Sequence, residues 1–277
     1  MINRREFAGL AAGAAAASMP GARAIAQAQQ QFGHPHPPIV REDDPAISVE
    51  RVQLRRVDGV VNAYAAYPKT FRANAPGIVI AMHIWGVDEQ LRDTVRRYAK
   101  AGFMCIAPDL YSRMNAPSGD GSTDVDTFKP YAAQLQRKQY GGDMRAAALH
   151  LLAKAPQGKH GVNGFCMGGH LALIQAIDNA DVFDAVAPFY GAVKDIDPAE
   201  IHIPVCGSYG EKDASIPADD VRAWRGLLHV PNDVRIYASA GHAFFDDTRS
   251  SYVASAADDA WKRTIKFFAG TLGLQQP

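Results

Sequence analysis

Residues 163–170, NGFCMGGH, have the residue types and spacing that present a nucleophile. The motif G-x-C-x-G-G, centred on Cys166, follows an apolar segment typical of a strand and precedes one typical of a helix. A sharp strand-to-helix turn strains the central residue and leaves no room for side chains two positions before and after it. It also aims the amide of Met167 toward a forming oxyanion. The motif predicts a nucleophilic cysteine; taken alone, it also fits a glycine-rich junction with an inert thiol.

A thiol nucleophile needs a base, and the base needs an acid that orients it. His242, in AGHAFF, and Asp213, in GEKDASIP, each follow a later predicted strand. Enzymes built on such a turn carry the three residues in the chain order nucleophile, acid, histidine. We therefore expect a triad of Cys166, Asp213 and His242. Three other residues compete for the role of the acid: Glu211, Asp219 and Asp220.

Strand-like and helix-like segments alternate around these residues. An antiparallel hairpin is expected on either side of Asp58-Gly59, over 47–57 and 60–68. Further strands are expected at 77–85, 103–111, 159–166, 183–191, 203–210 and 233–240, and helices at 88–102, 141–155, 167–178, 217–229 and 251–270. Buried strands alternating with helices predict a mostly parallel sheet covered on both faces. Such a sheet binds ligands at the carboxyl ends of its strands, where the three candidates lie.

Between Tyr111 and Phe128 the chain is rich in Gly, Ser, Pro and Asp. A loop of this length inside a compact domain is either functional or irregular. Because it leaves the carboxyl end of a predicted strand, it is a candidate lid over the site.

The overall composition is that of one globular catalytic domain. The chain has 277 residues, 47% hydrophobic, and its 29 basic residues balance 29 acidic ones. There is no basic excess to attract nucleic acid or anionic lipid. The three cysteines, Cys105, Cys166 and Cys206, show no metal-ligand spacing, which argues against a structural metal or a disulfide scaffold. Cys105 and Cys206 lie in apolar runs and are expected to be small buried side chains.

The N-terminal region has a different character. Arg4-Arg5 precede an Ala/Gly-rich apolar run and small-x-small sites, which predicts a twin-arginine signal peptide over 1–28 and a periplasmic protein. The alternative is a disordered or helical tail, and the run is too short for a stable membrane span. Residues 29–45 are expected to form a linker or an irregular arm with solvated histidines, His34 and His36, and 46–277 a single domain.

Four segments resemble the dienelactone hydrolase family of α/β-hydrolases: IVIAMHIWGV, FMCIAPDLYSR, GFCMGGHLAL, and the stretch from GEKDASIP through AGHAFF to KFF. The resemblance covers roughly residues 47–272 and implies an α/β-hydrolase fold. It implies Cys166 as nucleophile, His242 as base and Asp213 as orienting acid. It also places a second oxyanion donor at the amide of Ile84, and Trp85 where the family has a pocket aromatic, although Trp85 also fits plain core packing. The family's mechanism uses no metal or organic cofactor.

Two positions depart from the family's pattern. His83 stands where the family usually has a glutamate that helps to activate the cysteine. A protonated His83 favours the thiolate and a neutral one accepts its proton, unless the side chain simply faces elsewhere. Four residues after His242, Asp246 replaces an arginine that grips the substrate carboxylate. Arg249 and Arg113 are the cationic candidates that remain, so an anionic lactone is not the expected substrate.

These features predict a hydrolase that cleaves a small carboxylic ester or lactone through a thioester on Cys166. Two alternatives stay open: an acyltransferase that uses the same triad, and a non-catalytic ligand-binding protein in which His83 has disabled the cysteine. We expect a monomer or a small homo-oligomer.

Overall fold

The computed structural model describes residue 36 and residues 38–119 and 123–274. The predicted signal peptide at 1–28, and with it the prediction of export, lies outside the described residues. So do residues 29–35, which begin the predicted linker.

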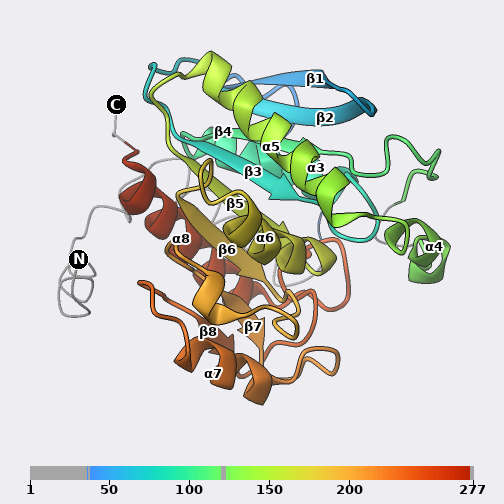
Figure 1. Cartoon of the computed structure of the whole chain (residues 1–277), viewed down its shortest axis with the longest axis vertical. Helices are drawn as coiled ribbons and strands as arrows, with labels where there is room; N and C mark the ends of the chain where they lie inside the picture. Colours follow the sequence, from blue (N-terminus) through green and yellow to red (C-terminus); the bar gives the residue numbers. More distant parts are fainter. Residues whose placement is uncertain (1–35, 37, 120–122, 275–277) are drawn as a thin grey trace.

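An eight-stranded sheet forms the centre of the described chain, with strand order β1-β2-β4-β3-β5-β6-β7-β8 (Figure 1). The strands are β1 (Ile47–Arg56), β2 (Gly59–Pro68), β3 (Gly77–Ala81), β4 (Met104–Pro108), β5 (His160–Phe165), β6 (Ala185–Phe189), β7 (Ser208–Gly210) and β8 (Arg235–Tyr237). The first two strands pair antiparallel, as do β2 and β4. All later neighbours pair parallel. The predicted edge hairpin and mostly parallel sheet are thus confirmed.

Helices cover both faces of the sheet. They are α3 (Glu89–Lys100), α4 (Lys129–Ala132), α5 (Arg137–Lys154), α6 (Met167–Asp178), α7 (Ala218–Gly226) and α8 (Ala254–Leu272), with 3₁₀ turns η2 (Val125–Thr127) and η3 (Pro198–Glu200). Helices α5 and α6 lie on one face, and α3 and α8 on the other (Figure 1). On that second face Tyr98 of α3 packs against Trp261 of α8, with ring centroids 4.8 Å apart.

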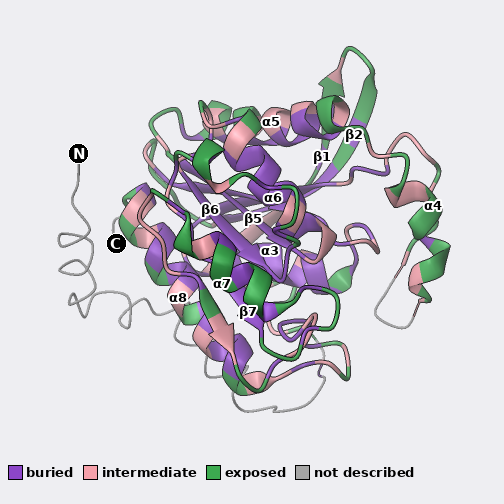
Figure 2. Ribbon diagram, turned by 60° about the horizontal axis from the view of Figure 1, so that its bottom comes forward, coloured by how far each residue is buried: buried purple, intermediate pink, exposed green. Residues whose placement is uncertain are grey.

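Burial explains the two kinds of strand. Every residue of β3, β4, β5 and β6 is buried, as expected of apolar runs sandwiched between helices. The edge strand β1 has exposed residues among buried ones, because only one of its faces meets the core. Figure 2 shows the central strands buried and exposed residues on the outer sides of the helices.

Several expected boundaries were wrong; β3 ends at Ala81 and not at 85, and β8 spans only Arg235–Tyr237 of the expected 233–240. Helix α5 begins at Arg137, before the expected start near Gly141. The Gly141-Gly142 pair looked like a helix boundary but lies inside the helix, where a side chain at Gly142 would overlap the guanidinium of Arg56. In 203–210 the regular strand is only Ser208–Gly210, and Val205 makes isolated bridges to Val186 and Asn232.

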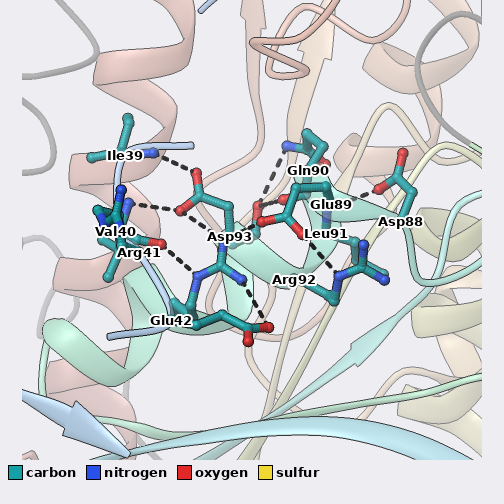
Figure 3. Close-up of polar contacts among 12 residues, drawn as sticks. Ile39, Val40, Arg41, Glu42, Asp88, Glu89, Gln90, Leu91, Arg92 and Asp93 are labelled. Atoms are coloured by element: carbon teal, nitrogen blue, oxygen red, sulfur yellow. Dashed lines mark hydrogen bonds and ion pairs between the residues drawn. The ribbon is translucent and has the colours of Figure 1, made fainter. Parts of the chain in front are cut away.

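The described part of 29–45 is an irregular arm that is fixed to α3. The carboxylate of Asp93 accepts the backbone N–H groups of Ile39 and Val40, at 3.0 and 2.8 Å (Figure 3). Arg96 donates to the carbonyl of Val40 at 2.5 Å. The arm therefore satisfies buried charged groups of the helix, which a free linker would not do.

His36 is not solvated, contrary to expectation. It is buried, its backbone N–H donates to the carbonyl of Asp247 at 2.8 Å, and its Nε2 lies 3.5 Å from the Asp247 carboxylate. Arg97 joins the same carboxylate to Asp93. The arm is thereby connected to the segment that follows His242. Composition did not reveal this because the contacts are made to residues far away in the chain.

Candidate active site

Cys166 lies on a sharp turn between β5 and α6. Its backbone has φ 56° and ψ −120°, a left-handed conformation that a residue with a side chain adopts only under strain. A Cβ at Gly164 would overlap the carbonyl of Gly168, and one at Gly168 would overlap the carbonyl of Ala81. Two glycines of the motif are therefore required by close backbone contacts, which the spacing predicted.

The structure brings Cys166, His242 and Asp213 into one hydrogen-bonded chain. His242 Nε2 lies 3.0 Å from Cys166 Sγ, and its Nδ1 lies 2.7 Å from Asp213 Oδ2. The carboxylate is buried, with a side chain 1% exposed, while the imidazole is 31% exposed. Asp213 Oδ1 accepts the amides of Ser215 and Ile216, which fixes the carboxylate. An imidazole with a buried acid behind it and a thiol in front can move a proton to and from a bound molecule.

The rival acids lie elsewhere. Glu211 and Asp219 both pair with Arg222. Asp220 is an exposed residue in the first turn of α7. Among the four carboxylates, Asp213 is thus the one bonded to His242.

The electrostatics favour a thiolate–imidazolium pair. Burial lowers the pKa of His242, but the hydrogen bonds with Asp213 and Cys166 outweigh it and raise the pKa to about 10. Burial raises the pKa of Cys166, but the hydrogen bond from His242 and its charge, the amide of Met167 and the charge of His83 lower it overall. By contrast, burial raises the pKa of Cys105 well above its usual range and that of Cys206 to about 12. Of the three thiols, Cys166 is the one whose pKa is lowered.

The second predicted oxyanion donor lies on a tight turn after β3. The carbonyl of His83 accepts the N–H of Gly86 at 3.1 Å, and Gly86 has φ +82°. The amide of Ile84 belongs to the same peptide plane as that carbonyl and so points the opposite way, out of the turn. The hydroxyl of Tyr111 donates to the carbonyl of Ile84 at 3.0 Å and holds the turn in place.

His83 is buried beside a carboxylate that the sequence did not single out. Its Nε2 lies 3.1 Å from Asp88 Oδ1, and both side chains are almost fully buried. Asp88 is also the N-cap of α3 and accepts the N–H of Leu91 at 3.0 Å. Burial alone lowers the pKa of His83, whereas the charge of Asp88 and its hydrogen bond, together with Asp246 and Cys166, raise it overall.

Trp85 connects the turn to two other segments. Its ring lies edge-on to His83, with centroids 5.6 Å apart, and the guanidinium of Arg249 stacks on it at 3.5 Å. Its Nε1 donates to the carbonyl of Thr123 at 2.8 Å, so the predicted lid contacts the site from residues 112–128. The Nε of Arg249 donates to Asp246 at 2.7 Å. Asp246 thus pairs with Arg249, one of the two arginines considered as candidates to bind the substrate.

The structure does not bring Arg113 to the cysteine. Its guanidinium donates to both oxygens of Asp143 in α5, at 2.8 and 2.9 Å, and to Asp58 in the turn between β1 and β2. This ion-pair cluster fixes the hairpin to the helix. The guanidinium of Arg113 is thus held by Asp143 and Asp58, and the structure gives no support to its predicted role as a substrate-binding candidate.

Sequence reasoning missed Tyr190, whose buried ring lies 5.3 Å from that of His242. Its φ of 37° and the φ of 58° at Ala243 are strained conformations on two sides of the histidine. The signal for Tyr190 was its position at the carboxyl end of the predicted strand 183–191. Asp88 had a similar signal, as the first residue of the predicted helix 88–102, because a carboxylate at a helix start often caps it.

No group of three or more His, Cys, Asp and Glu side chains among the described residues has an arrangement that could hold a metal ion. No described helix is long and apolar enough to cross a bilayer.

An open, mostly parallel sheet with a nucleophile turn after its central strand defines an α/β-hydrolase. The sequence model of the Dienelactone hydrolase family matches residues 61–272, and the chain belongs to that family. It is 31% identical over 249 residues to a protein of Escherichia coli K12 named "Putative carboxymethylenebutenolidase", covering 83% of this chain and 90% of the relative. A relative of the same name from Methylorubrum extorquens is 33% identical over 237 residues, covering 78% and 79%.

A solved structure from Klebsiella pneumoniae, named "Putative Dienelactone Hydrolase", superposes with a TM-score of 0.74 at 29% identity. The match covers 81% of this chain and 99% of that one. The predicted fold and family are confirmed, and the chain is a dienelactone-hydrolase-like hydrolase, an enzyme of a family that acts on lactones and esters.

Proposed function

We propose that this hydrolase cleaves a small carboxylic ester or lactone through a thioester on Cys166. The observation that carries the proposal is the unbroken chain from Cys166 Sγ through His242 to Asp213 Oδ2, with contacts of 3.0 and 2.7 Å. This arrangement supplies a nucleophile, a base and an orienting acid in one line.

In the first step the Cys166 sulfur attacks the carbonyl carbon, and His242 holds the proton that the thiol has given up. The amides of Met167 and Ile84 donate to the carbonyl oxygen as it becomes negative. The carbon–oxygen bond of the ester then breaks, and His242 passes its proton to the leaving alkoxide. The product alcohol departs, or remains tethered when the substrate is a lactone.

In the second step water replaces the alcohol. His242 takes a proton from water, the hydroxide attacks the thioester carbonyl, and the carbon–sulfur bond breaks to release the acid and the Cys166 thiolate. Asp213 accepts the Nδ1–H of the imidazole throughout and so holds Nε2 toward the sulfur.

The experiment compares hydrolysis of an activated ester by the wild type and by Cys166→Ala. We expect kcat/KM to fall by about 10³-fold or more. Cys206→Ala is the matched control, because that thiol is buried and its pKa is raised, and this variant should keep its activity. Undiminished turnover in Cys166→Ala would contradict the proposal.

Thiol alkylation separates an enzyme from a ligand-binding derivative. Iodoacetamide should modify Cys166 in the folded protein well before Cys105 and Cys206, which are fully buried. Equal rates at the three positions would favour the binding protein, and mass spectrometry of tryptic peptides gives the rates directly.

For localisation we propose export through the twin-arginine route, on the basis of Arg4-Arg5 and the apolar run after them. The test is fractionation of cells that express the full chain and an Arg4→Lys/Arg5→Lys variant. The wild type should reach the periplasm in a shortened form, and the variant should stay in the cytoplasm at full length.

A further inference from the structure

The residue pair Asp88–His83 has no role in the chain from Cys166 to Asp213, yet it is built like a second pair of acid and imidazole. His83 Nε2 lies 3.1 Å from Asp88 Oδ1, with side chains 5% and 2% exposed. A buried carboxylate is costly unless it is paired and hydrogen-bonded. Asp88 meets both conditions, through His83 and through the N–H of Leu91.

The surroundings of His83 hold charges of both signs. The charges of Asp88, Cys166 and Asp246 act on His83, and that of Arg249 acts on Asp88. The backbone of Met82, the residue before His83, packs against Gly168 in the turn that carries Cys166. Arg249 is paired with Asp246 and stacks on Trp85, which lies edge-on to His83. Asp88 is therefore the carboxylate that bonds directly to the imidazole.

One ring nitrogen of His83 has no hydrogen-bond partner in the described structure. Its Nδ1 is buried and has no hydrogen-bond partner among the described residues. Buried polar atoms are nearly always paired, and exceptions in native proteins often mark functional sites. With Nε2 bonded to Asp88, Nδ1 is the ring nitrogen that is left without a bond.

The two departures from the family's pattern are also complementary. The resemblance implies a glutamate at the position of His83 and an arginine at the position of Asp246, so this chain has a basic residue for an acidic one and an acidic residue for a basic one. An exchange at both positions keeps the local charge balance, which a change at one position alone would not.

We propose that Asp88 holds His83 as an imidazolium behind Cys166, and that this second Asp–His pair favours the thiolate in place of the family's glutamate. His83 and Asp88 are positioning residues in this assignment, since they act on the nucleophile and not on the substrate bond. The inference rests on the proposed function of Cys166.

The test is the pH dependence of Cys166 alkylation in wild type and Asp88→Asn. Asparagine caps a helix as well as aspartate does, so this change removes the charge and keeps the bond to the N–H of Leu91. We expect the alkylation midpoint to rise by about 0.5–1 pH unit, which lowers the rate below the midpoint by about 3- to 10-fold.

The matched control is Asp219→Asn. Asp219 also lies in the first turn of a helix, but its side chain is 92% exposed. This variant should keep the wild-type midpoint. Equal shifts in both variants would overturn the assignment, because they would show a general effect of net charge.

A double-mutant cycle tests whether Asp88 affects the pKa of Cys166 through His83 or by its own charge. In a His83→Gln background, Asp88→Asn should leave the midpoint unchanged or lower it, since only the repulsion between Asp88 and the thiolate is removed. If Asp88→Asn does not fold, His83→Gln alone carries the test and should raise the midpoint in the same direction.

The outcomes distinguish this inference from the proposed function, because alkylation requires no ester. A wild-type Cys166 that titrates like an ordinary thiol would overturn the proposed function. The alkylation midpoint of the wild type could instead be lowered and stay unchanged in Asp88→Asn or His83→Gln. This result would overturn only the role of the Asp88–His83 pair.

Discussion

Two acid–imidazole pairs contribute to the lowered pKa of Cys166, and they differ in exposure and in the nitrogen that each bonds to its acid. In the pair Asp213–His242 the acid binds Nδ1, which leaves Nε2 against the thiol, and the imidazole is 31% exposed. In the pair Asp88–His83 the acid binds Nε2, and the imidazole is 5% exposed. An open imidazole can exchange protons with substrate and water, whereas a closed one contributes a fixed charge.

The comparison shows how location assigns a role to the same residue types. His242 lies on a loop after β8, within a strained segment that includes Ala243. His83 lies in a turn after β3 whose carbonyl is bonded to Gly86 and which is packed under Trp85. The loop can offer its side chain to a ligand, and the tight turn keeps its side chain within the protein.

The largest expected difference comes from removing each imidazole. His242→Gln should lower kcat/KM for an activated ester by about 10³- to 10⁴-fold, because proton transfer to and from Cys166 is lost. His83→Gln should lower it by about tenfold or less, since only the charge beside the thiolate changes. Steady-state kinetics on both variants provides the check, and equal losses would contradict the assigned division of roles.

The next effect concerns the acid that orients the base. Asp213→Asn should lower kcat by about 10²- to 10⁴-fold, because the amide no longer holds the tautomer that directs Nε2 to the sulfur. Single-turnover measurements of thioester formation locate the loss in the first chemical step. A normal rate of acylation in this variant would mean that Asp213 serves the structure only.

The third prediction uses the opposite pKa shifts of His242 and Cys166. In the folded protein the pair holds one proton from the lowered pKa of Cys166 up to about pH 10. In the unfolded chain the same two side chains hold two protons below about pH 6.5, one proton between about pH 6.5 and 9, and none above about pH 9. The contribution of the pair to the free energy of unfolding is therefore largest between about pH 6.5 and about pH 9. It decreases as the pH falls below 6.5 toward the lowered pKa of Cys166, and as it rises from 9 to 10.

Urea unfolding of wild type and Cys166→Ala across this pH range measures that contribution. The difference between the two proteins should be largest from about pH 6.5 to 9 and should shrink on both sides. A difference that does not change with pH would show that no thiolate–imidazolium pair forms.

The smallest expected effect falls on Arg249. Arg249→Met keeps an extended apolar side chain against Trp85 but removes the cation and the bond to Asp246. We expect a change of about 2- to 5-fold in KM for a neutral ester, with kcat nearly kept, because a cation over an exposed ring is worth about 0.5–1 kcal/mol. A loss confined to kcat would place Arg249 nearer to the reacting atoms.

Much of the architecture was predictable from local patterns. The apolar runs indicated the buried strands, and Asp58-Gly59 indicated the hairpin turn between β1 and β2. The glycines around Cys166 indicated a turn in which the backbone packs too closely to leave room for side chains. The described structure contains those close backbone contacts. The start of α5 was not predictable, because the Gly141-Gly142 pair lies inside the helix, where Gly142 packs against the guanidinium of Arg56 from a distant strand.

The fold, the family and the chain order of Cys166, Asp213 and His242 could be predicted from the sequence, because each depends on local spacing and on periodic burial. Which carboxylate bonds which side chain became clear only from the folded chain. Asp213 meets His242, Arg113 is bound by Asp143, and His83 is bound by Asp88. These pairings join strand ends and helix starts that are far apart in the chain, and the hydrogen bonds and charges that select them exist only once the sheet has formed.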